Sequence, residues 1–175
     1  MWSTCYTGGP TMKSFAIVTL ACLVVAAESF IMSRRSLRAS CNVDWTFSLS
    51  CTDVQDKLVG QIGRWTGPDG CADGGEKCLY KLVSKTKTQV KATRETPKQR
   101  YVDDLTFTFT QDRNKCNVAG VSRSRAWYAV LDYGTNYCNL HNLIVGAELD
   151  KSQGYREATS NRMCRGFSSA DCSKS

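Results

Sequence analysis

The stretch Leu105-Thr106-Phe107-Thr108-Phe109-Thr110 alternates strictly between apolar and hydroxyl side chains. Successive side chains of a β-strand point to opposite faces. Leu105, Phe107 and Phe109 are therefore predicted to face a core, and the threonines to face solvent. This alternation is typical of an antiparallel strand that is buried on one face only, and it predicts a strand over residues 101–110.

Segments on both sides of this strand show similar short runs separated by polar turns. They predict five more strands, at roughly 78–85, 88–94, 115–122, 126–132 and 138–145. The connections between them are too short for crossover helices, so neighbouring strands are expected to pair as antiparallel hairpins. The result is a six-stranded antiparallel meander.

A helical pattern precedes the strands. Val54, Leu58, Ile62 and Trp65 recur at spacings of four, four and three, which places them on one face of a helix. Asp53 is its expected N-cap. The segment from Cys41 to Cys51 forms a short loop or strand. The predicted fold is mostly β (α+β), with one N-terminal helix followed by a meander that forms a curled sheet or barrel.

The length of 175 residues, with 42% hydrophobic and 22% charged residues, predicts one globular domain after a targeting segment. Lys13 and the apolar run 15–27 are typical of a secretory signal peptide. Residues 1–27 are therefore a signal peptide with an upstream extension. Residues 28–40 are either a flexible basic N-terminus or a propeptide cut after Arg38, in an RxxR pattern. Residues 41–175 form a single disulfide-rich domain.

Eight cysteines remain after the signal peptide: Cys41, Cys51, Cys71, Cys78, Cys116, Cys138, Cys164 and Cys172. An even number in a secreted chain predicts four disulfides and an extracellular location. The expected pairs are Cys41–Cys51, Cys71–Cys78, Cys164–Cys172 and Cys116–Cys138. The spacings do not resemble paired zinc ligands, so neither a metal nor another cofactor is expected.

No constellation of catalytic residues stands out, and the chain is predicted not to be an enzyme. His141 is the one histidine of the chain. It is expected on the sixth strand, on the face of Asn139 and Leu143, either in a structural role or merely exposed to solvent. Asp103 and Asp104 are adjacent, so a strand would point them to opposite faces, which argues against paired acid–base catalysis.

Positive charge concentrates between Lys77 and Arg100, where eight basic residues face one acidic residue. Such a segment attracts polyanions, or it keeps an edge hairpin soluble and unpaired. Both interpretations remain open. The candidate polyanion-binding residues are Lys81, Lys85, Lys87, Lys91 and Arg94.

Aromatic residues gather around the last predicted hairpin, at Trp127, Tyr128, Tyr133 and Tyr137. They form either part of the core or the lining of a ligand cavity, since ligand pockets are mostly apolar with a few placed polar groups. The candidate ligand-binding residues of the sheet are Leu105, Phe107, Phe109, Trp127, Leu131 and Leu140.

Two secreted families share short motifs with the chain. Gly63-Arg64-Trp65 is similar to the opening G-x-W motif of the lipocalins. Val130-Leu131-Asp132-Tyr133 resembles their second motif, with Leu131 at the usual threonine. This resemblance implies an antiparallel barrel that carries small apolar molecules. The order of helix and strands also resembles the cystatins. Gln89-Val90-Lys91-Ala92-Thr93 is similar to their Q-x-V-x-G turn, with Thr93 at its glycine, which implies protease inhibition.

The sequence therefore predicts a secreted binding protein that carries a small apolar or amphipathic ligand in a β-sheet pocket. The alternative is a secreted interaction or inhibitor protein that binds acidic glycans or proteins through its basic hairpin. Neither nucleic acid nor a membrane span is expected, and the oligomeric state is left open.

Overall fold

A computed structural model describes residues 38–128 and 132–173, which all lie in one compact unit. Its elements follow the order β1 (Ser40–Phe47), α2 (Cys51–Arg64), the 3₁₀ helix η1 (Asp69–Gly74), β2 (Tyr80–Lys85), β3 (Gln89–Glu95), β4 (Val102–Asp112), β5 (Lys115–Ser124), α3 (Thr135–Gly146), β6 (Arg156–Ala158) and the 3₁₀ helix η2 (Phe167–Ser169). The predicted signal peptide and Leu131 lie outside the described residues.

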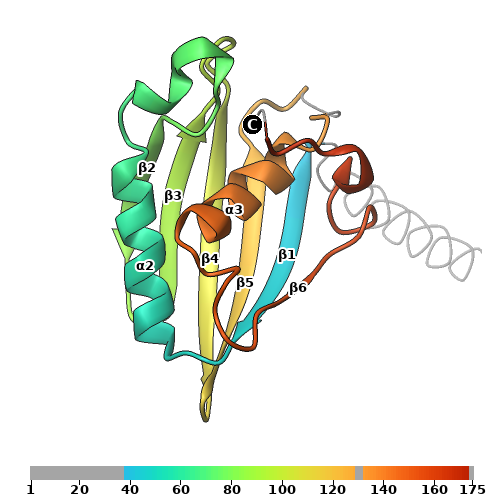
Figure 1. The fold of residues 1–175 in the computed structure, drawn as a ribbon. Helices are drawn as coiled ribbons and strands as arrows, with labels where there is room; N and C mark the ends of the chain where they lie inside the picture. The colour runs from blue at the N-terminus through green and yellow to red at the C-terminus, as the bar shows by residue number, and fades with distance from the viewer. Residues whose placement is uncertain (1–37, 129–131, 174–175) are drawn as a thin grey trace, which may run out of the picture. The chain divides into compact units, whose positions relative to one another are not determined.

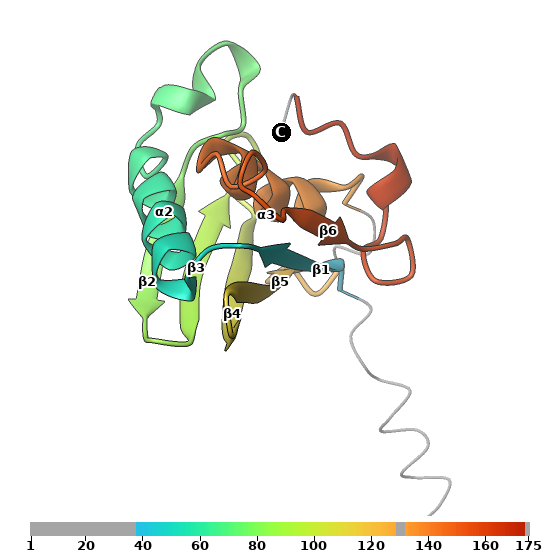
Figure 2. The same cartoon turned by 60° about the horizontal axis from the view of Figure 1, so that its bottom comes forward.

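The six strands form one antiparallel sheet in the order β2-β3-β4-β5-β1-β6 (Figure 1). The sheet is open, which excludes the barrel, one of the two predicted forms. Both helices lie on the same face of it (Figure 2). No described element covers the other face, which carries mainly Thr, Asn and charged side chains. The apolar face is therefore buried by helix packing and not by closure of the sheet.

The first four predicted strands are confirmed as β2 to β5. In β4, Leu105, Phe107 and Phe109 are at most 3% exposed, while Thr108 and Thr110 face solvent. The segment after Cys41 is also a strand, β1. It lies between β5 and β6, so the first strand of the domain is paired with strands from much later in the chain.

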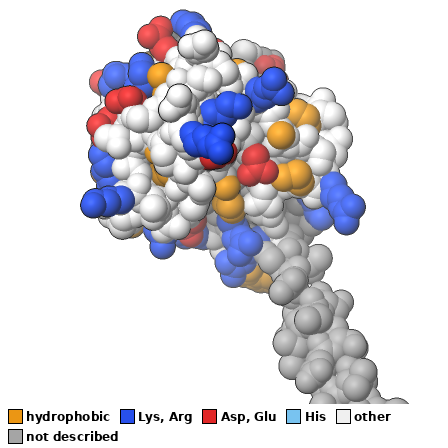
Figure 3. Space-filling model, turned by 90° about the horizontal axis from the view of Figure 1, so that it is seen from below, with side chains coloured by type: hydrophobic (Ala, Val, Ile, Leu, Met, Phe, Trp, Pro, Cys, Tyr) orange, Lys and Arg blue, Asp and Glu red, His pale blue; other side chains and the backbone are white. Residues whose placement is uncertain are grey.

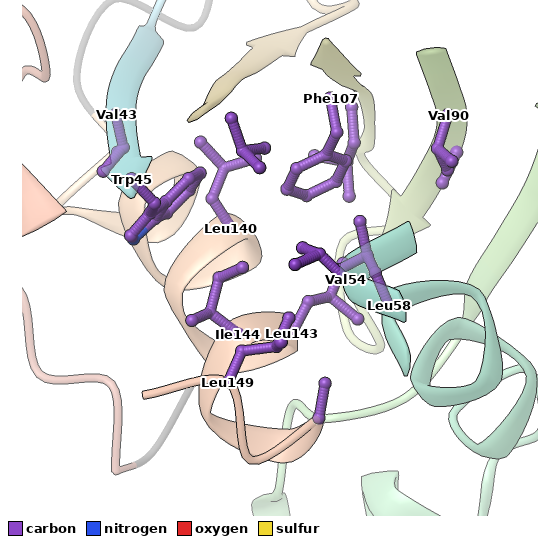
Figure 4. Packing of buried hydrophobic residues seen from close by; sticks show 14 of the residues in the cluster. Val43, Trp45, Val54, Leu58, Val90, Phe107, Leu140, Leu143, Ile144 and Leu149 are labelled. Atoms are coloured by element: carbon purple, nitrogen blue, oxygen red, sulfur yellow. The ribbon is translucent and has the colours of Figure 1, made fainter. Parts of the chain in front are cut away.

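The core lies between the sheet and the two helices (Figure 4). Val43, Trp45 and Phe107 of the sheet meet Leu58 of α2 and Leu140 of α3, and all are at most 2% exposed. Burying such side chains stabilises the fold by roughly 1.5–3 kcal/mol each.

The prediction of a strand over 138–145 is wrong, because these residues belong to helix α3. Buried apolar residues recur there at helical spacings of three, one and three, at Leu140, Leu143, Ile144 and Ala147. The prediction of a strand over 126–132 is also wrong for its described residues, which are turn and irregular. The described residues 38–128 and 132–173 therefore contain two α-helices and not one.

Helix α2 was placed correctly, but its expected N-cap was wrong. Ser50 is the cap, and its hydroxyl accepts a hydrogen bond from the backbone N–H of Asp53 at 3.1 Å. Asp53 therefore lies in the first turn, where its negative charge favours the helix.

All eight cysteines form disulfides, but three of the expected pairs are wrong. The bridges are Cys41–Cys164, Cys51–Cys116, Cys71–Cys78 and Cys138–Cys172. Only the Cys71–Cys78 pair was predicted. The others join elements far apart in sequence, because β1 pairs with β5 and β6 and the C-terminal segment packs beside α3.

Candidate functional site

A hollow of about 290 Å³ lies at the end of the sheet where β4 begins and β5 ends, at the top of Figure 1. We call it the polar pocket. It is bounded by the segment after η1, the β3–β4 loop, the ends of β4 and β5, and the start of α3. Its lining residues are Glu76, Thr96, Lys98, Gln99, Tyr101, Asp103, Ser124, Asp132, Tyr133, Thr135 and Asn136.

A buried polar row runs beneath this pocket. Tyr80, Arg94, Asp103 and Ser124 are partners in register across β2, β3, β4 and β5, and each is at most 4% exposed. Buried polar groups need partners, and α3 provides some of them. The hydroxyl of Tyr80 donates to the backbone oxygen of Asn139 at 3.2 Å.

Arg94 was predicted to bind polyanions, and the structure corrects this, because its side chain is 1% exposed. Its Nη2 donates to the backbone oxygen and to Oε2 of Glu76, at 2.8 and 2.9 Å. Its Nε and Nη1 have no hydrogen-bond partner among the described residues. The guanidinium therefore lies behind the pocket wall formed by Glu76 and Asp103.

Asp103 and Asp104 point to opposite faces, as predicted. Asp104 is exposed, and its Oδ1 accepts from Nη2 of Arg125 at 2.6 Å. Asp103 is 3% exposed, and its Oδ2 accepts from Nδ2 of Asn139 at 2.7 Å. Burial raises the pKa of Asp103, and the hydrogen bond from Asn139 counteracts part of this effect.

Asp132 holds the start of α3 at the pocket. Its carboxylate accepts from the backbone N–H of Asn136 at 2.9 Å and of Gly134 at 3.3 Å. These bonds satisfy donors that a helix N-terminus leaves free. Gly134 has φ +88, and a Cβ on it would lie 2.5 Å from Cβ of Ala170, so only glycine fits there.

Aromatic rings surround the mouth of the pocket. Tyr101 and Tyr133 line it. Tyr133 is 83% exposed, and its backbone has a left-handed φ of +51. The exposed Tyr128 contacts Tyr101 and Trp127 edge-on. Large exposed aromatic groups are uncommon on a surface and indicate binding sites.

The five described residues among those predicted to bind a ligand do not line this pocket. Leu105, Phe107, Phe109 and Leu140 pack in the core, and Trp127 is 73% exposed beside the pocket mouth. Their role in ligand binding stays a prediction. The predicted aromatic group is also divided, because Tyr137 lies on α3 and contacts Phe167 of the C-terminal segment.

Sequence reasoning did not identify Glu157 of β6. Its carboxylate accepts from four side chains: Tyr137 OH at 2.6 Å, Trp45 Nε1 at 2.8 Å, His141 Nδ1 at 3.0 Å and Tyr155 OH at 3.1 Å. Burial alone would raise the pKa of Glu157, but these hydrogen bonds outweigh it and lower that pKa to about 2. No pattern in the sequence signals this cluster, which depends on the long-range pairing of β1 with β6.

His141 is on α3 and not on a strand, so it does not share a strand face with Asn139 and Leu143. Its ring stacks on Tyr137 with centroids 5.0 Å apart, and its Nδ1 bonds to Glu157. It ties α3 to β6.

The remaining basic candidates lie on the β2–β3 hairpin. Lys81 and Lys91 share a sheet face with Thr93 and Ser84, their register partners, while Lys87 is in the turn. Lys85 lies on the other face, because a β-bulge separates Leu82 from Ser84, and its Nζ is 2.6 Å from Asp56 of α2. Seen from the lower end of Figure 1, basic side chains are spread over the surface between neutral ones (Figure 3).

Within residues 38–128 and 132–173, no group of three or more His, Cys, Asp or Glu side chains could hold a metal ion. In the same part of the chain, no helix has the length and apolar character needed to cross a membrane. Comparison of the chain with protein-family models, curated proteins and solved structures found no match. The similarities to lipocalins and cystatins therefore stay predictions.

Proposed function

We propose that the chain is a secreted binding protein that takes a small amphipathic ligand in the polar pocket. The observation that carries this proposal is the meeting of exposed tyrosine rings with buried, fixed polar groups in one hollow. Binding sites combine apolar surface with a few oriented polar groups. The four disulfides support an oxidising, extracellular environment.

The polar groups of the pocket are held in place from behind. Asn139 fixes Asp103, Arg94 fixes Glu76, and the first turn of α3 fixes Asp132. Groups that are already oriented lose little entropy when a ligand binds. The chain thus presents a preformed site, whereas the apolar residues of the sheet are already covered by the helices.

Filling the pocket is expected to abolish ligand binding. Thr135 lines the pocket and is partly exposed at the start of α3, so Thr135→Trp places an indole in the hollow. Thr108→Trp is the matched control, on the uncovered face of β4. A library of amphipathic fragments would be screened by ligand-observed NMR. We expect fragments that bind the wild type and the control but not Thr135→Trp. Equal binding to both variants would contradict the proposal.

A second candidate function is the docking of the β2–β3 hairpin onto acidic glycans. The observation that favours it is the exposure of Lys81, Lys87 and Lys91 on one edge hairpin. The competing explanation is that lysines and the β-bulge protect β2, an edge strand, from pairing with other chains.

A heparin column separates these two explanations. The variant with Lys81, Lys87 and Lys91 all changed to Gln is expected to elute at clearly lower salt than the wild type, because clustered charges act together on a polyanion. The control changes the exposed Lys57, Lys115 and Lys151 to Gln, with the same loss of charge. If both triple variants elute at the same salt, net charge alone governs binding and the hairpin is not a docking site.

A further inference from the structure

The negative charges of the carboxyl groups in the polar pocket are already balanced by donor groups of the protein itself. The Arg94 guanidinium pairs with Glu76 at 2.9 Å, and backbone N–H groups of α3 bond to Asp132. Asn139 donates to Asp103, which also lies opposite Arg94 in the β3–β4 register. A cationic ligand would therefore find little uncompensated negative charge, and the exposed Lys98 at the mouth would repel it.

An anionic ligand fits no better. Its carboxylate, phosphate or sulfate group would lie beside Glu76, Asp103 and Asp132, and Lys98 is the one exposed cation among the pocket's lining residues. Carboxylate oxygens only accept hydrogen bonds, so they offer an anionic group no donor and disfavour its binding. The charges around the pocket therefore favour a ligand with no net charge.

The polar groups require a ligand that both donates and accepts hydrogen bonds. Carboxylates only accept, whereas the ammonium of Lys98 and the side-chain amide of Gln99, which also line the pocket, can donate. Lining hydroxyls, such as those of Thr96 and Thr135, can do either. A ligand hydroxyl can accept from one of these donors and donate to a carboxylate at once. An ammonium cannot accept, and an ionised carboxylate cannot donate.

The rings of Tyr101 and Tyr133 add flat apolar faces at the mouth of the same hollow. Such faces pack against the C–H groups of a rigid ring, and aromatic contacts of this kind contribute beyond the area they bury. Resting on the proposed function, we propose that the polar pocket binds a neutral, hydroxyl-rich ring compound, a pyranose sugar in chemical class. Its hydroxyls meet Asp103, Asp132 and Glu76, while its C–H face lies on the tyrosines.

The test is ligand-observed NMR with the methyl glycosides of glucose, galactose, mannose and N-acetylglucosamine. Benzylamine serves as the cationic comparison and benzoate as the anionic one. We expect at least one glycoside to bind the wild type, with the same affinity at low and high NaCl, because a neutral ligand is not screened. Tyr101→Ala and Tyr133→Ala should each weaken it about tenfold. Thr108→Ala, on the opposite face, should leave it unchanged.

The outcomes separate this inference from the proposed function. One outcome is that benzylamine or benzoate binds the wild type but not Thr135→Trp, that its affinity falls with salt, and that no glycoside binds. The sugar assignment is then overturned, and the pocket remains a ligand site. If none of these compounds binds and no fragment is sensitive to Thr135→Trp, both proposals fail. Tyr101 and Tyr133 are exposed by 39% and 83%, so their variants are expected to fold.

Discussion

Replacing Glu157 with alanine is expected to lower the free energy of unfolding by about 3–5 kcal/mol. Four donors, from Trp45, Tyr137, His141 and Tyr155, lose their shared acceptor in a partly buried place. These donors belong to β1, α3 and the segment before β6, so the loss affects three parts of the fold at once. Urea unfolding at neutral pH measures the effect.

The matched control is Glu148→Ala. Glu148 pairs with Lys151 at 3.0 Å, but both side chains are more than two-thirds exposed. Exposed ion pairs contribute little to stability, so this variant should unfold close to the wild type. If the two variants lose equal stability, the buried cluster does not have the role described here.

The Glu157 cluster also predicts the response to acid. The pKa of Glu157 is about 2 in the folded protein and near its ordinary value of 4.5 in the unfolded chain. Its contribution is therefore complete above the unfolded pKa and is lost as the pH falls from about 4.5 towards 2, amounting to at most about 3 kcal/mol because solvent screens this partly buried carboxylate. Glu157→Gln should remove this part of the acid sensitivity. Urea midpoints at neutral pH and at pH near 3 would show whether it does.

Removing the Cys41–Cys164 bridge is the second large change. The bridge joins residues 123 apart and closes nearly the whole domain into one loop. The loss of loop-closure restraint in the unfolded chain predicts a cost of about 5 kcal/mol for the variant with both cysteines changed to alanine. Thermal and urea unfolding of the purified domain provide the measurement.

The Cys71–Cys78 bridge provides the comparison, because its two cysteines are seven residues apart. The same reasoning gives a cost of about 2.5 kcal/mol for its removal. A double-alanine variant at Cys71 and Cys78 should therefore fold and unfold at clearly higher urea than the Cys41 and Cys164 variant. The reverse order would show that loop length does not govern the stability of this domain.

The local parts of the fold were predictable from sequence, and the long-range parts were not. The alternation in β4 and the apolar stripe of α2 each depend on neighbouring residues, so both were predicted correctly. Helix α3 was missed because its buried side includes Asn136, Asn139 and Asn142, which obscure its apolar pattern. Its helical spacing of Leu140, Leu143 and Ile144 was the signal that could have found it.

The candidate site was predictable only in part. The sequence pointed to aromatic residues near Trp127 and Tyr133, and three of the four predicted aromatics do lie at or beside the pocket. It gave no sign that Arg94 would be buried, because its neighbours Lys91 and Lys98 are exposed. The sequence also gave no sign that Glu76, Asp103 and Asp132 line the same pocket. Those residues come from separate segments that only the completed sheet and α3 bring together.

The place of β1 between β5 and β6 has a consequence for synthesis. As the chain leaves the ribosome, Cys41 and Cys51 emerge together, ten residues apart, long before Cys164 exists. Any oxidation at that moment joins the wrong pair. The native bridges then require Cys41 and Cys51 to stay reduced until their partners have been synthesised. Otherwise, a premature bridge must be exchanged through attack by another thiolate. The yield of correctly paired protein should therefore depend on the disulfide-isomerase capacity of the producing cell.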